Sequence, residues 1–271
     1  MPVDPQRVRH AVHKIIEEEP ELSDSMLLFL EIFTAQVRMC DILAKYIIAE
    51  DLVKYFNQAR SSGSSLFDAY DIPKIDPQVW EELASGILSA LVSRRRDLRE
   101  ELSVISNSIK EGLFDLESLA RLSFKGDLNY ARGVSLTIGV SEDLLSAIGV
   151  WIMQSLFLAI KEALDGKIDS KGWDKGFCPI CGSYTKTSFT DEKGVHLKCE
   201  ICGMEWDYPE NRCPFCGSSE AESSYLRRGF YSMKCNACGG DWSLVDESAL
   251  EGGIPREIYP ILILGLEEDL T

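Results

Sequence analysis

The chain has 271 residues, with 28 lysines and arginines against 44 aspartates and glutamates, so its formal net charge is −16. The acidic excess is spread along the chain, since residues 1–170 carry a net charge of −9 and residues 171–271 a net charge of −7. A negatively charged surface repels phosphate backbones, which disfavours a general nucleic-acid-binding protein. The length allows one domain with a large core and a second, smaller domain.

Residues 1–165 are expected to be helical. Between Pro20 and Pro73 there is no proline and a single glycine, Gly63. Apolar residues in this segment recur at the spacing of one helix face. They are Met26, Leu30, Phe33, Val37, Cys40 and Ile47. We expect the run to end near Arg60, before the sequence SSGSS, and Cys40 to be a core residue rather than a reactive thiol.

Two further helix starts follow. Asp76 before Pro77 has the pattern of a cap residue followed by proline in the first turn. A second apolar stripe, stopped at Gly112, consists of Leu98, Leu102, Ile105 and Ile109. The three arginines at 94–96 are expected on a solvated face, with contact to a partner as the alternative.

The last expected helix of this half begins at Ser141 and ends at Gly166. It contains an uncharged stretch of 17 residues, Leu144–Ile160. This length is at the lower limit of a membrane span, which needs about 17–25 residues, and the stretch includes two serines and a glutamine. We therefore expect a buried core helix and no membrane span. The start, MPVDPQRVRH, has no apolar run of the secretory type, and nine cysteines without an export signal favour reduced thiols in the cytoplasm.

From about Gly166 the composition changes to glycine, cysteine, proline and aromatic residues. The sequence therefore predicts an α+β protein: an N-terminal all-α helical bundle, residues 1–170, followed by a metal-binding domain, residues 171–271. This second domain would hold two small tandem units of rubredoxin-like or zinc-ribbon type. The apolar tail IPREIYPILILGL is expected to dock on the helical domain.

The second region contains an internal repeat. CPICGS at Cys178 recurs as CPFCGS at Cys213, 35 positions later, and LKCEICGMEW around Cys199 recurs as MKCNACGGDW around Cys235, 36 positions later. Two copies of one small unit explain this pattern. Each copy has a C-x2-C pair, then 17 or 18 residues, then a second C-x2-C pair.

This spacing predicts two metal sites with four cysteine ligands each. A C-x2-C turn directs two thiolates at one ion, and a hairpin brings the second pair to the remaining corners of a tetrahedron. The expected ligands of the first ion are Cys178, Cys181, Cys199 and Cys202, and those of the second are Cys213, Cys216, Cys235 and Cys238. Pairing of the two middle motifs across the short gap from Cys202 to Cys213 is the alternative. Glycine after each second cysteine permits the positive φ that turns amides toward sulfur.

Other candidates for function carry weaker patterns. His196 could replace a cysteine ligand, but we expect it on a solvated strand. His10 and His13 share a helix face without a third ligand. Trp206 and Trp242, each four residues after a cysteine, are expected to pack over the metal sites or to anchor a peptide. No catalytic or organic-cofactor residue is predicted, since the sequence contains no phosphate loop and no Ser–His–Asp set.

The motifs CPICG, LKCEICGMEW and RCPFCG and the last C-x2-C pair resemble the formate dehydrogenase accessory protein (FdhE) family, as does the ending VDESALEGGIPREIYPILILGL. The resemblance is specific over Cys178–Cys238 and this ending. It implies a cytoplasmic, non-enzymatic protein that binds the catalytic subunit of a formate dehydrogenase, or of a related molybdenum or tungsten oxidoreductase, and supports its maturation. It also implies two mononuclear metal ions, iron or zinc, bound by the eight cysteines.

Two other functions remain open from the sequence. A rubredoxin-like site that holds iron could carry electrons or sense redox state. A zinc-ribbon module could bind nucleic acid through Arg227, Arg228 and Lys234, although the charge of the region opposes it. The sequence indicates neither the native metal, nor the client enzyme and the residues that select it, nor the oligomeric state.

Overall fold

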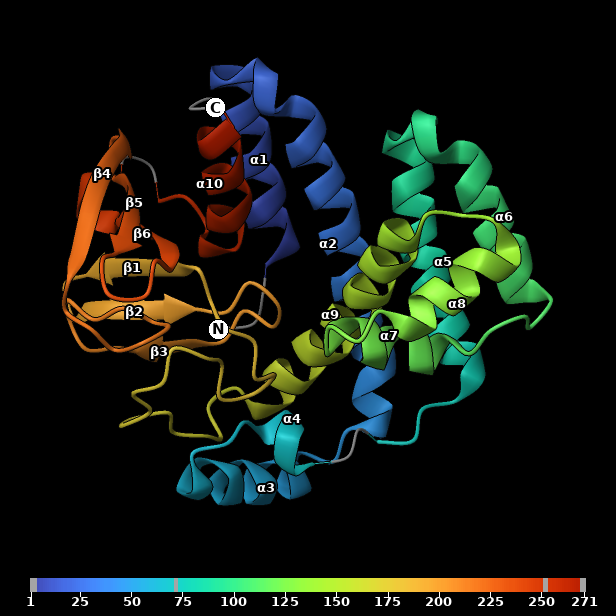
Figure 1. The fold of residues 1–271 in the computed structure, drawn as a ribbon, viewed down its shortest axis with the longest axis horizontal. Coiled ribbons are helices and arrows are strands. Elements are labelled where there is room, and N and C mark those ends of the chain that lie inside the picture. Colours follow the sequence, from blue (N-terminus) through green and yellow to red (C-terminus); the bar gives the residue numbers. More distant parts are fainter. Residues whose placement is uncertain (1–3, 71–72, 251–252, 269–271) are drawn as a thin grey trace. The chain divides into compact units, whose positions relative to one another are not determined.

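The computed structural model describes residues 4–70, 73–250 and 253–268 (Figure 1). By their contacts the residues form two compact units, each assembled from segments that are distant in sequence. The helical unit contains Glu19–Ile47 and Pro73–Ala163. The sheet unit contains Met1–Glu18, Ile48–Ile72 and Leu164–Thr271. Segments of the N-terminal half belong to both units. The domain boundary near residue 170 therefore stays a prediction.

The helical unit is a bundle in which α5 contacts α2, α6 and α7, and α8 contacts α6 and α7. Its helices are α2 (Ser23–Leu43), α5 (Pro77–Arg94), α6 (Arg99–Lys110), α7 (Leu116–Phe124), α8 (Asn129–Ile138) and α9 (Glu142–Leu164). Short 3-10 turns are η1 (Pro20–Leu22), η2 (Ala44–Tyr46) and η3 (Arg96–Leu98). The predicted starts at Asp76 and Ser141 are confirmed, and the stripe on α6 buries Leu102 and Ile105.

Helix α9 is packed as the predicted core helix. By length and composition it is the one helix in the described part of the chain that could cross a membrane, and 61% of its most apolar window is buried. Gln36 of α2 donates hydrogen bonds to the Trp151 carbonyl and to Gln154, at 3.1 and 2.9 Å. The rings of Phe124 and Phe157 lie 4.7 Å apart. Through these contacts α2 and α7 pack against α9.

The expectation of a continuous helical run to Arg60 is wrong at one place. Helix α2 ends at Leu43, and Ile47 and Ile48 are extended, with φ of −106° and −98°. The next helix, α3 (Ala49–Ser62), begins after them. The residues on either side of this break belong to different units. Branching at Cβ also favours the extended conformation at two consecutive isoleucines.

In its described residues, the sheet unit combines four helices with one six-stranded sheet. The helices are α1 (Pro5–Glu18), α3, α4 (Leu66–Ala69) and α10 (Tyr259–Glu268), with 3-10 turns η4 (Glu247–Ala249) and η5 (Arg256–Ile258). The strands are β1 (Thr187–Asp191), β2 (Gly194–Lys198), β3 (Glu205–Asp207), β4 (Ala221–Arg227), β5 (Phe230–Cys235) and β6 (Asp241–Asp246). Their order is β3-β2-β1-β6-β5-β4. The predicted α+β class, with a helical half followed by two cysteine-bearing units, is confirmed.

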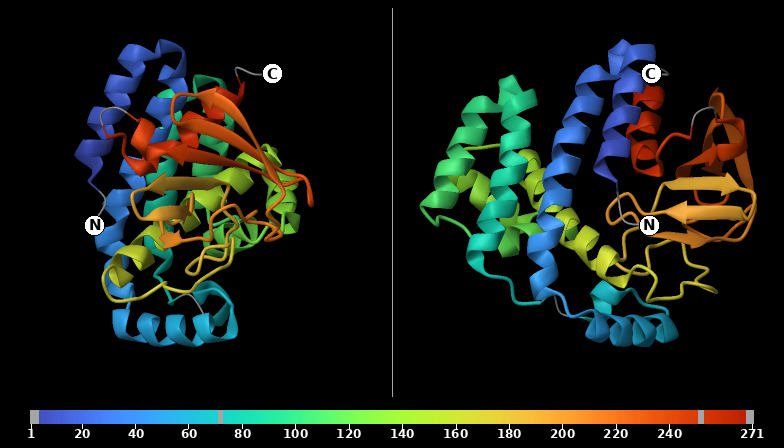
Figure 2. Two further views of the ribbon diagram at one scale, coloured as in Figure 1. Left: turned by 90° about the vertical axis from the view of Figure 1, so that its left-hand side faces the viewer. Right: turned by 180° about the vertical axis from the view of Figure 1, so that it is seen from behind.

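Each sequence repeat forms one antiparallel three-stranded meander. The first copy supplies β1–β3 and the second supplies β4–β6. The two meanders join through a parallel pairing of β1 with β6, from Thr187 opposite Ser243 to Thr190 opposite Asp246. Ser188 reinforces this seam, since its buried hydroxyl donates to the Ser243 carbonyl at 2.9 Å. The repeat therefore produces one continuous sheet, which is twisted in the views of Figure 2.

The C-terminal segment is held on the sheet unit. Helices α1 and α10 lie side by side (Figures 1 and 2), and η5 contacts α1, which comes from the N-terminal half. The guanidinium of Arg256 lies 3.9 Å from the centre of the Phe189 ring. It also pairs with Glu247 at 2.6 Å, with Glu205 at 2.7 Å and with Asp191 at 3.3 Å. Hydrogen bonding to Glu247 raises the pKa of Arg256, so the cation is permanent.

Replacing Arg256 with glutamine should lower the free energy of unfolding of the sheet unit by about 1–3 kcal/mol, because the carboxylates of Glu247, Glu205 and Asp191 would lose the cation that they share, although Glu205 would keep its pair with Lys198. Urea denaturation followed by tryptophan fluorescence measures this change. Arg9→Gln, at an exposed position of α1 in the same unit, is the control. Equal midpoints for the two variants would contradict the role of Arg256.

Candidate metal centres

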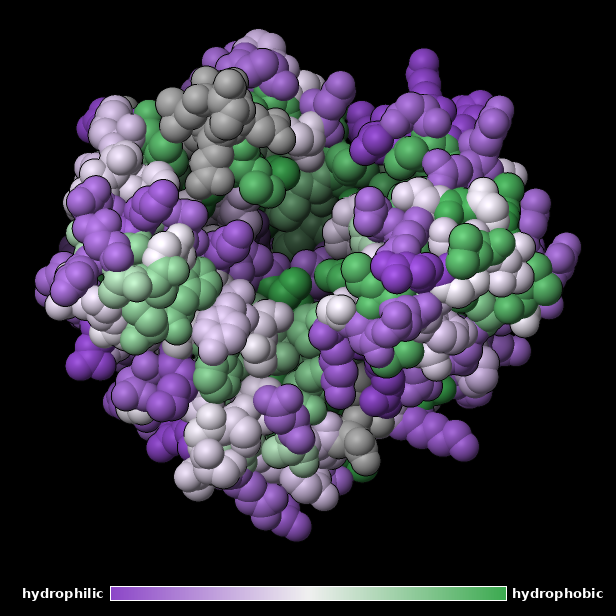
Figure 3. All heavy atoms as spheres, in the orientation of Figure 1, coloured by the Kyte–Doolittle hydropathy of each residue, from purple (hydrophilic) through white to green (hydrophobic). Residues whose placement is uncertain are grey.

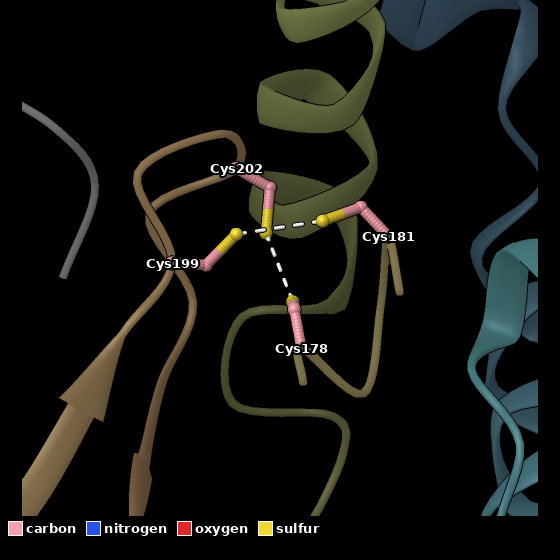
Figure 4. A group of neighbouring side chains, drawn as sticks. All are labelled: Cys178, Cys181, Cys199 and Cys202. Carbon is pink, nitrogen blue, oxygen red and sulfur yellow. Dashed lines mark hydrogen bonds between the residues drawn. The ribbon is translucent and has the colours of Figure 1, made fainter. Parts of the chain in front are cut away.

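The eight cysteines of the repeat come together as two groups of four. The first group is Cys178, Cys181, Cys199 and Cys202, and the second is Cys213, Cys216, Cys235 and Cys238. Within each group the sulfur atoms lie within 4.8 Å of one another. Figure 4 shows the first group, with side chains converging from two loops. This is the grouping expected from the repeat, and the alternative pairing of the two middle motifs is wrong.

The sulfur separations fit a tetrahedral ion. In the first group Cys178 and Cys202 are 3.4 Å apart, as are Cys181 and Cys199. In the second group Cys213 and Cys238 are 3.7 Å apart, and Cys216 and Cys235 are 3.6 Å apart. Disulfide sulfurs would lie about 2.05 Å apart. A tetrahedron with metal–sulfur bonds of about 2.3 Å has edges of about 3.8 Å, close to the separations found here.

Each C-x2-C turn, which we call a knuckle, has the same backbone hydrogen bonds. The amide of the first cysteine donates to the carbonyl five residues later, at 2.8–2.9 Å. The amide of the glycine after the second cysteine donates back to the carbonyl of the first cysteine, at 2.8–3.0 Å. The four knuckles begin at Cys178, Cys199, Cys213 and Cys235. The sequence repeat is thus a repeat of backbone geometry.

The glycine in each knuckle is required by its backbone conformation. Gly182 has a φ of 80°, and Gly203, Gly217 and Gly239 have φ of 73–75°. Other residues rarely adopt such angles. Free amides then face sulfur atoms: those of Ile180 and Phe215 lie 3.4 Å from the sulfurs of Cys178 and Cys213. N–H groups in this position offset the negative charge of thiolate ligands.

The thiols of the first group need a cation before they can all ionise. Burial raises the pKa of the Cys178 and Cys202 thiols well above the ordinary value. Burial likewise raises the pKa of Cys213, in the second group, to about 12. A divalent ion supplies the positive charge that stabilises coordinated thiolates in a dry site. The donor set, four soft sulfurs without a carboxylate, suits zinc or iron.

The two tryptophans of the repeat are both buried, and Trp242 lies beside cysteines of the second group, as expected. Trp206 is buried, and its indole N–H donates to the Lys175 carbonyl at 3.0 Å. Trp242 forms a buried cluster with Cys213 and Cys235. Both indole rings are therefore packed inside the protein, and neither is exposed enough to anchor a bound peptide.

The expectation of a solvated position for His196 is wrong. Its side chain is buried on β2, and the ring nitrogens face Asp191 at 2.9 Å and Asp207 at 3.1 Å. The ring also stacks on Phe189 with a centroid distance of 4.9 Å. Asp191 also pairs with Arg256, so His196 lies beside a carboxylate that Arg256 binds. His196 belongs to neither sulfur group. His10 and His13 are exposed on α1 and belong to no ligand cluster among the described residues.

Cys40 lies in the helical unit and is separate from both groups. It is half-buried on α2, and burial raises the pKa of its thiol to about 11. Its sulfur lies 3.6 Å from the Gln36 carbonyl one turn earlier. Cys40 is thus a half-buried packing residue with a protonated thiol, rather than the fully buried core residue that the apolar stripe predicted.

Sequence reasoning missed the segment that covers the first knuckle. The amides of Leu66 and Phe67 donate to the carbonyls of Pro179 and Ile180, both at 2.9 Å. Ser65 caps this short helix α4: its hydroxyl accepts from the Asp68 amide and donates to the Asp68 carboxylate. The Ser-x-x-Asp pattern could have indicated the cap. It could not have indicated the knuckle over a hundred residues later that receives the helix.

The first and second copies also touch through their knuckles. Gly176 lies against the Pro214 backbone so closely that an added Cβ would come 1.7 Å from the Pro214 carbonyl oxygen. The ring of Tyr184 lies between Phe177 and Phe215, with centroid distances of 5.7 and 6.1 Å. The residue before Cys178 and the residue inside the Cys213 knuckle are therefore linked by one exposed tyrosine.

No protein-family model matches the chain. A curated FdhE homologue of Erwinia tasmaniensis is 27% identical over 191 residues, which are 68% of this chain and 58% of that protein. The FdhE protein of Escherichia coli is 25% identical over 184 residues, which are 66% of this chain and 55% of that protein. A homologue of Aquifex aeolicus is 30% identical over 90 residues, 31% of each chain. The match thus spans a little over half the length of the first two relatives.

The fold is also that of a solved structure. The crystal structure of the FdhE protein from Pseudomonas aeruginosa superimposes with a TM-score of 0.64. The superposition covers 99% of this chain and 94% of the Pseudomonas aeruginosa chain, and the sequence identity is 16%. The chain resembles FdhE in sequence and has the FdhE fold. The resemblance predicted from the FdhE-type cysteine motifs is therefore confirmed.

Two single variants, Cys178→Ser and Cys213→Ser, should each bind one metal equivalent instead of two, because a site with three sulfurs loses much of its affinity for the ion. Metal analysis of anaerobically purified protein measures this loss. We expect most of the helical circular dichroism of both variants to persist, since neither cysteine belongs to the helical unit, which contains α2 and α5–α9. Collapse of the helical signal in either variant would contradict the independence of that unit.

Replacing Gly176 with alanine should destabilise the sheet unit by about 3 kcal/mol, because the Pro214 backbone must move to admit a methyl group. Thermal unfolding of the metal-loaded protein measures the effect. Gly133→Ala on α8 is a control, since nothing lies within 4 Å of the added Cβ there and alanine favours a helix. Equal melting temperatures for the two variants would show that the two copies are not in close backbone contact.

Proposed function

We propose that this chain is an accessory protein that binds the catalytic subunit of a formate dehydrogenase, or of a related molybdenum or tungsten oxidoreductase, and supports its maturation or activation. One combined observation carries the proposal: two four-cysteine groups on a single sheet, within a fold that matches FdhE over nearly the whole chain. The family that the motifs resemble has this role.

Each four-cysteine group would hold one ion of iron or zinc, with Cys178, Cys181, Cys199 and Cys202 as ligands of the first ion and Cys213, Cys216, Cys235 and Cys238 as ligands of the second. When bound, such an ion crosslinks the knuckles, and iron would in addition allow one-electron exchange. Four cysteine ligands leave no coordination position for a substrate water, which supports a binding role rather than catalysis. Nine free thiols fit a reducing compartment, and we propose a cytoplasmic location.

The helical unit offers apolar side chains to a client. Several large apolar residues of this unit are exposed: Val92, Val104, Leu113, Leu128 and Leu136. Leu136 on α8 is 81% exposed. Figure 3 shows small apolar groups over α6 and α8, surrounded by hydrophilic side chains. Apolar side chains with a polar rim suit a protein–protein contact.

Affinity purification of the tagged full chain from its native cells, under anaerobic conditions, tests the proposal. We expect recovery of a catalytic subunit that carries molybdopterin or tungstopterin, together with two metal equivalents per chain. Leu136→Glu should reduce this recovery about tenfold, because a charge replaces an apolar contact, whereas Thr137→Glu at the exposed neighbouring position should not. Recovery of RNA polymerase or ribosomal proteins in place of an oxidoreductase would contradict the proposal.

A further inference from the structure

The two cysteine groups share their spacing and knuckle geometry but differ in exposure. In the first group all four cysteines are buried, with at most 1% of each residue exposed. In the second group Cys213 and Cys235 are buried to the same degree. Cys216 and Cys238 are exposed. One cysteine from each knuckle of the second group therefore faces solvent.

The cause of this difference lies in what surrounds each group. The first knuckle is covered by α4, through the hydrogen bonds of Leu66 and Phe67 to Pro179 and Ile180. Next to the second knuckle of the same group, the buried Thr185 hydroxyl lies within hydrogen-bond distance of the Lys198 carbonyl and of the Glu200 carboxylate. The first group is thus enclosed by protein.

The second group is covered on one side only. Phe215, Ala221 and Met233 pack against the cluster of Cys213, Cys235 and Trp242. The residues next to the two exposed cysteines in the sequence include small ones that are themselves exposed: Gly217, Ser219, Ala237 and Gly239. Side chains of this size leave the sulfurs of Cys216 and Cys238 within reach of a molecule from solution.

We infer that the second group is an exchange site, which passes its ion to external thiolate ligands through Cys216 and Cys238, whereas the first group retains its ion as a structural crosslink. This inference rests on the proposed metal binding by both groups. It assigns different roles to two sites that the sequence repeat makes look equivalent.

Exchange proceeds by substitution of one thiolate for another. An incoming thiolate forms a bond to the ion as the bond to Cys216 or Cys238 breaks, and the displaced cysteine takes the proton that the incoming thiol released. No electron is transferred, so iron or zinc keeps its oxidation state. At the first group the same step requires local unfolding of the protein that covers the sulfurs, which slows it.

Zinc transfer to the dithiol dimercaptosuccinate tests the inference on the full chain loaded with two zinc ions. Native mass spectrometry counts the ions that remain with time. We expect one ion to leave at least about tenfold faster than the other, because only one site is open without unfolding. Cys216→Ser should retain only the slow ion, and Cys181→Ser only the fast one. Loss of both ions from the wild-type chain at one rate, or a slow ion in Cys181→Ser, would overturn the inference.

Alkylation of the loaded wild-type chain gives a readout that needs no variant. N-ethylmaleimide should modify Cys216 and Cys238 before any cysteine of the first group, with half-buried Cys40 as an internal reference. Equal rates of modification in the two groups would contradict the inference. Failure of the chain to bind two zinc ions at the outset would instead contradict the proposed metal binding, so the two failures are distinguishable.

Discussion

The sheet unit depends on the convergence of eight cysteine sulfurs into two groups of four. Its strands are short, from three to seven residues, and the buried cluster at the second group consists of Cys213, Cys235 and Trp242. Coordinated thiolates would add crosslinks to these short strands, and metal binding and folding would then be one equilibrium. The knuckle amides and positive-φ glycines are the backbone counterpart of this constraint.

The two copies of the meander are joined in one sheet. Because β1 pairs with β6 in parallel, the two copies share their hydrogen-bond ladder rather than standing as separate modules. Ser188 and the contact of Gly176 with Pro214 close the seam at two further points. The copies then differ in their neighbours. One receives α4 as a cover and the other receives none among the described residues, which is how two equal motifs acquire different access to solvent.

The N-terminal half of the chain serves both units. Helices α1, α3 and α4 belong with the sheet, whereas α2 and α5–α9 form the bundle. A fragment that began at residue 171 would therefore lack the amides of Leu66 and Phe67 and the helix that η5 contacts.

The sequence by itself determined the α+β class, the helix starts at Asp76 and Ser141, the grouping of the eight cysteines and the resemblance to FdhE. These features are encoded locally, in residue spacing, caps and turn glycines, or in a repeat that can be read by comparison of the chain with itself. Only the tertiary structure decided the break at Ile47 and Ile48, the parallel seam between the copies, the burial of His196 and the unequal exposure of Cys178 and Cys216. Each of these depends on which distant segments become neighbours, and contacts between segments separated by tens of residues leave no periodic pattern in either one.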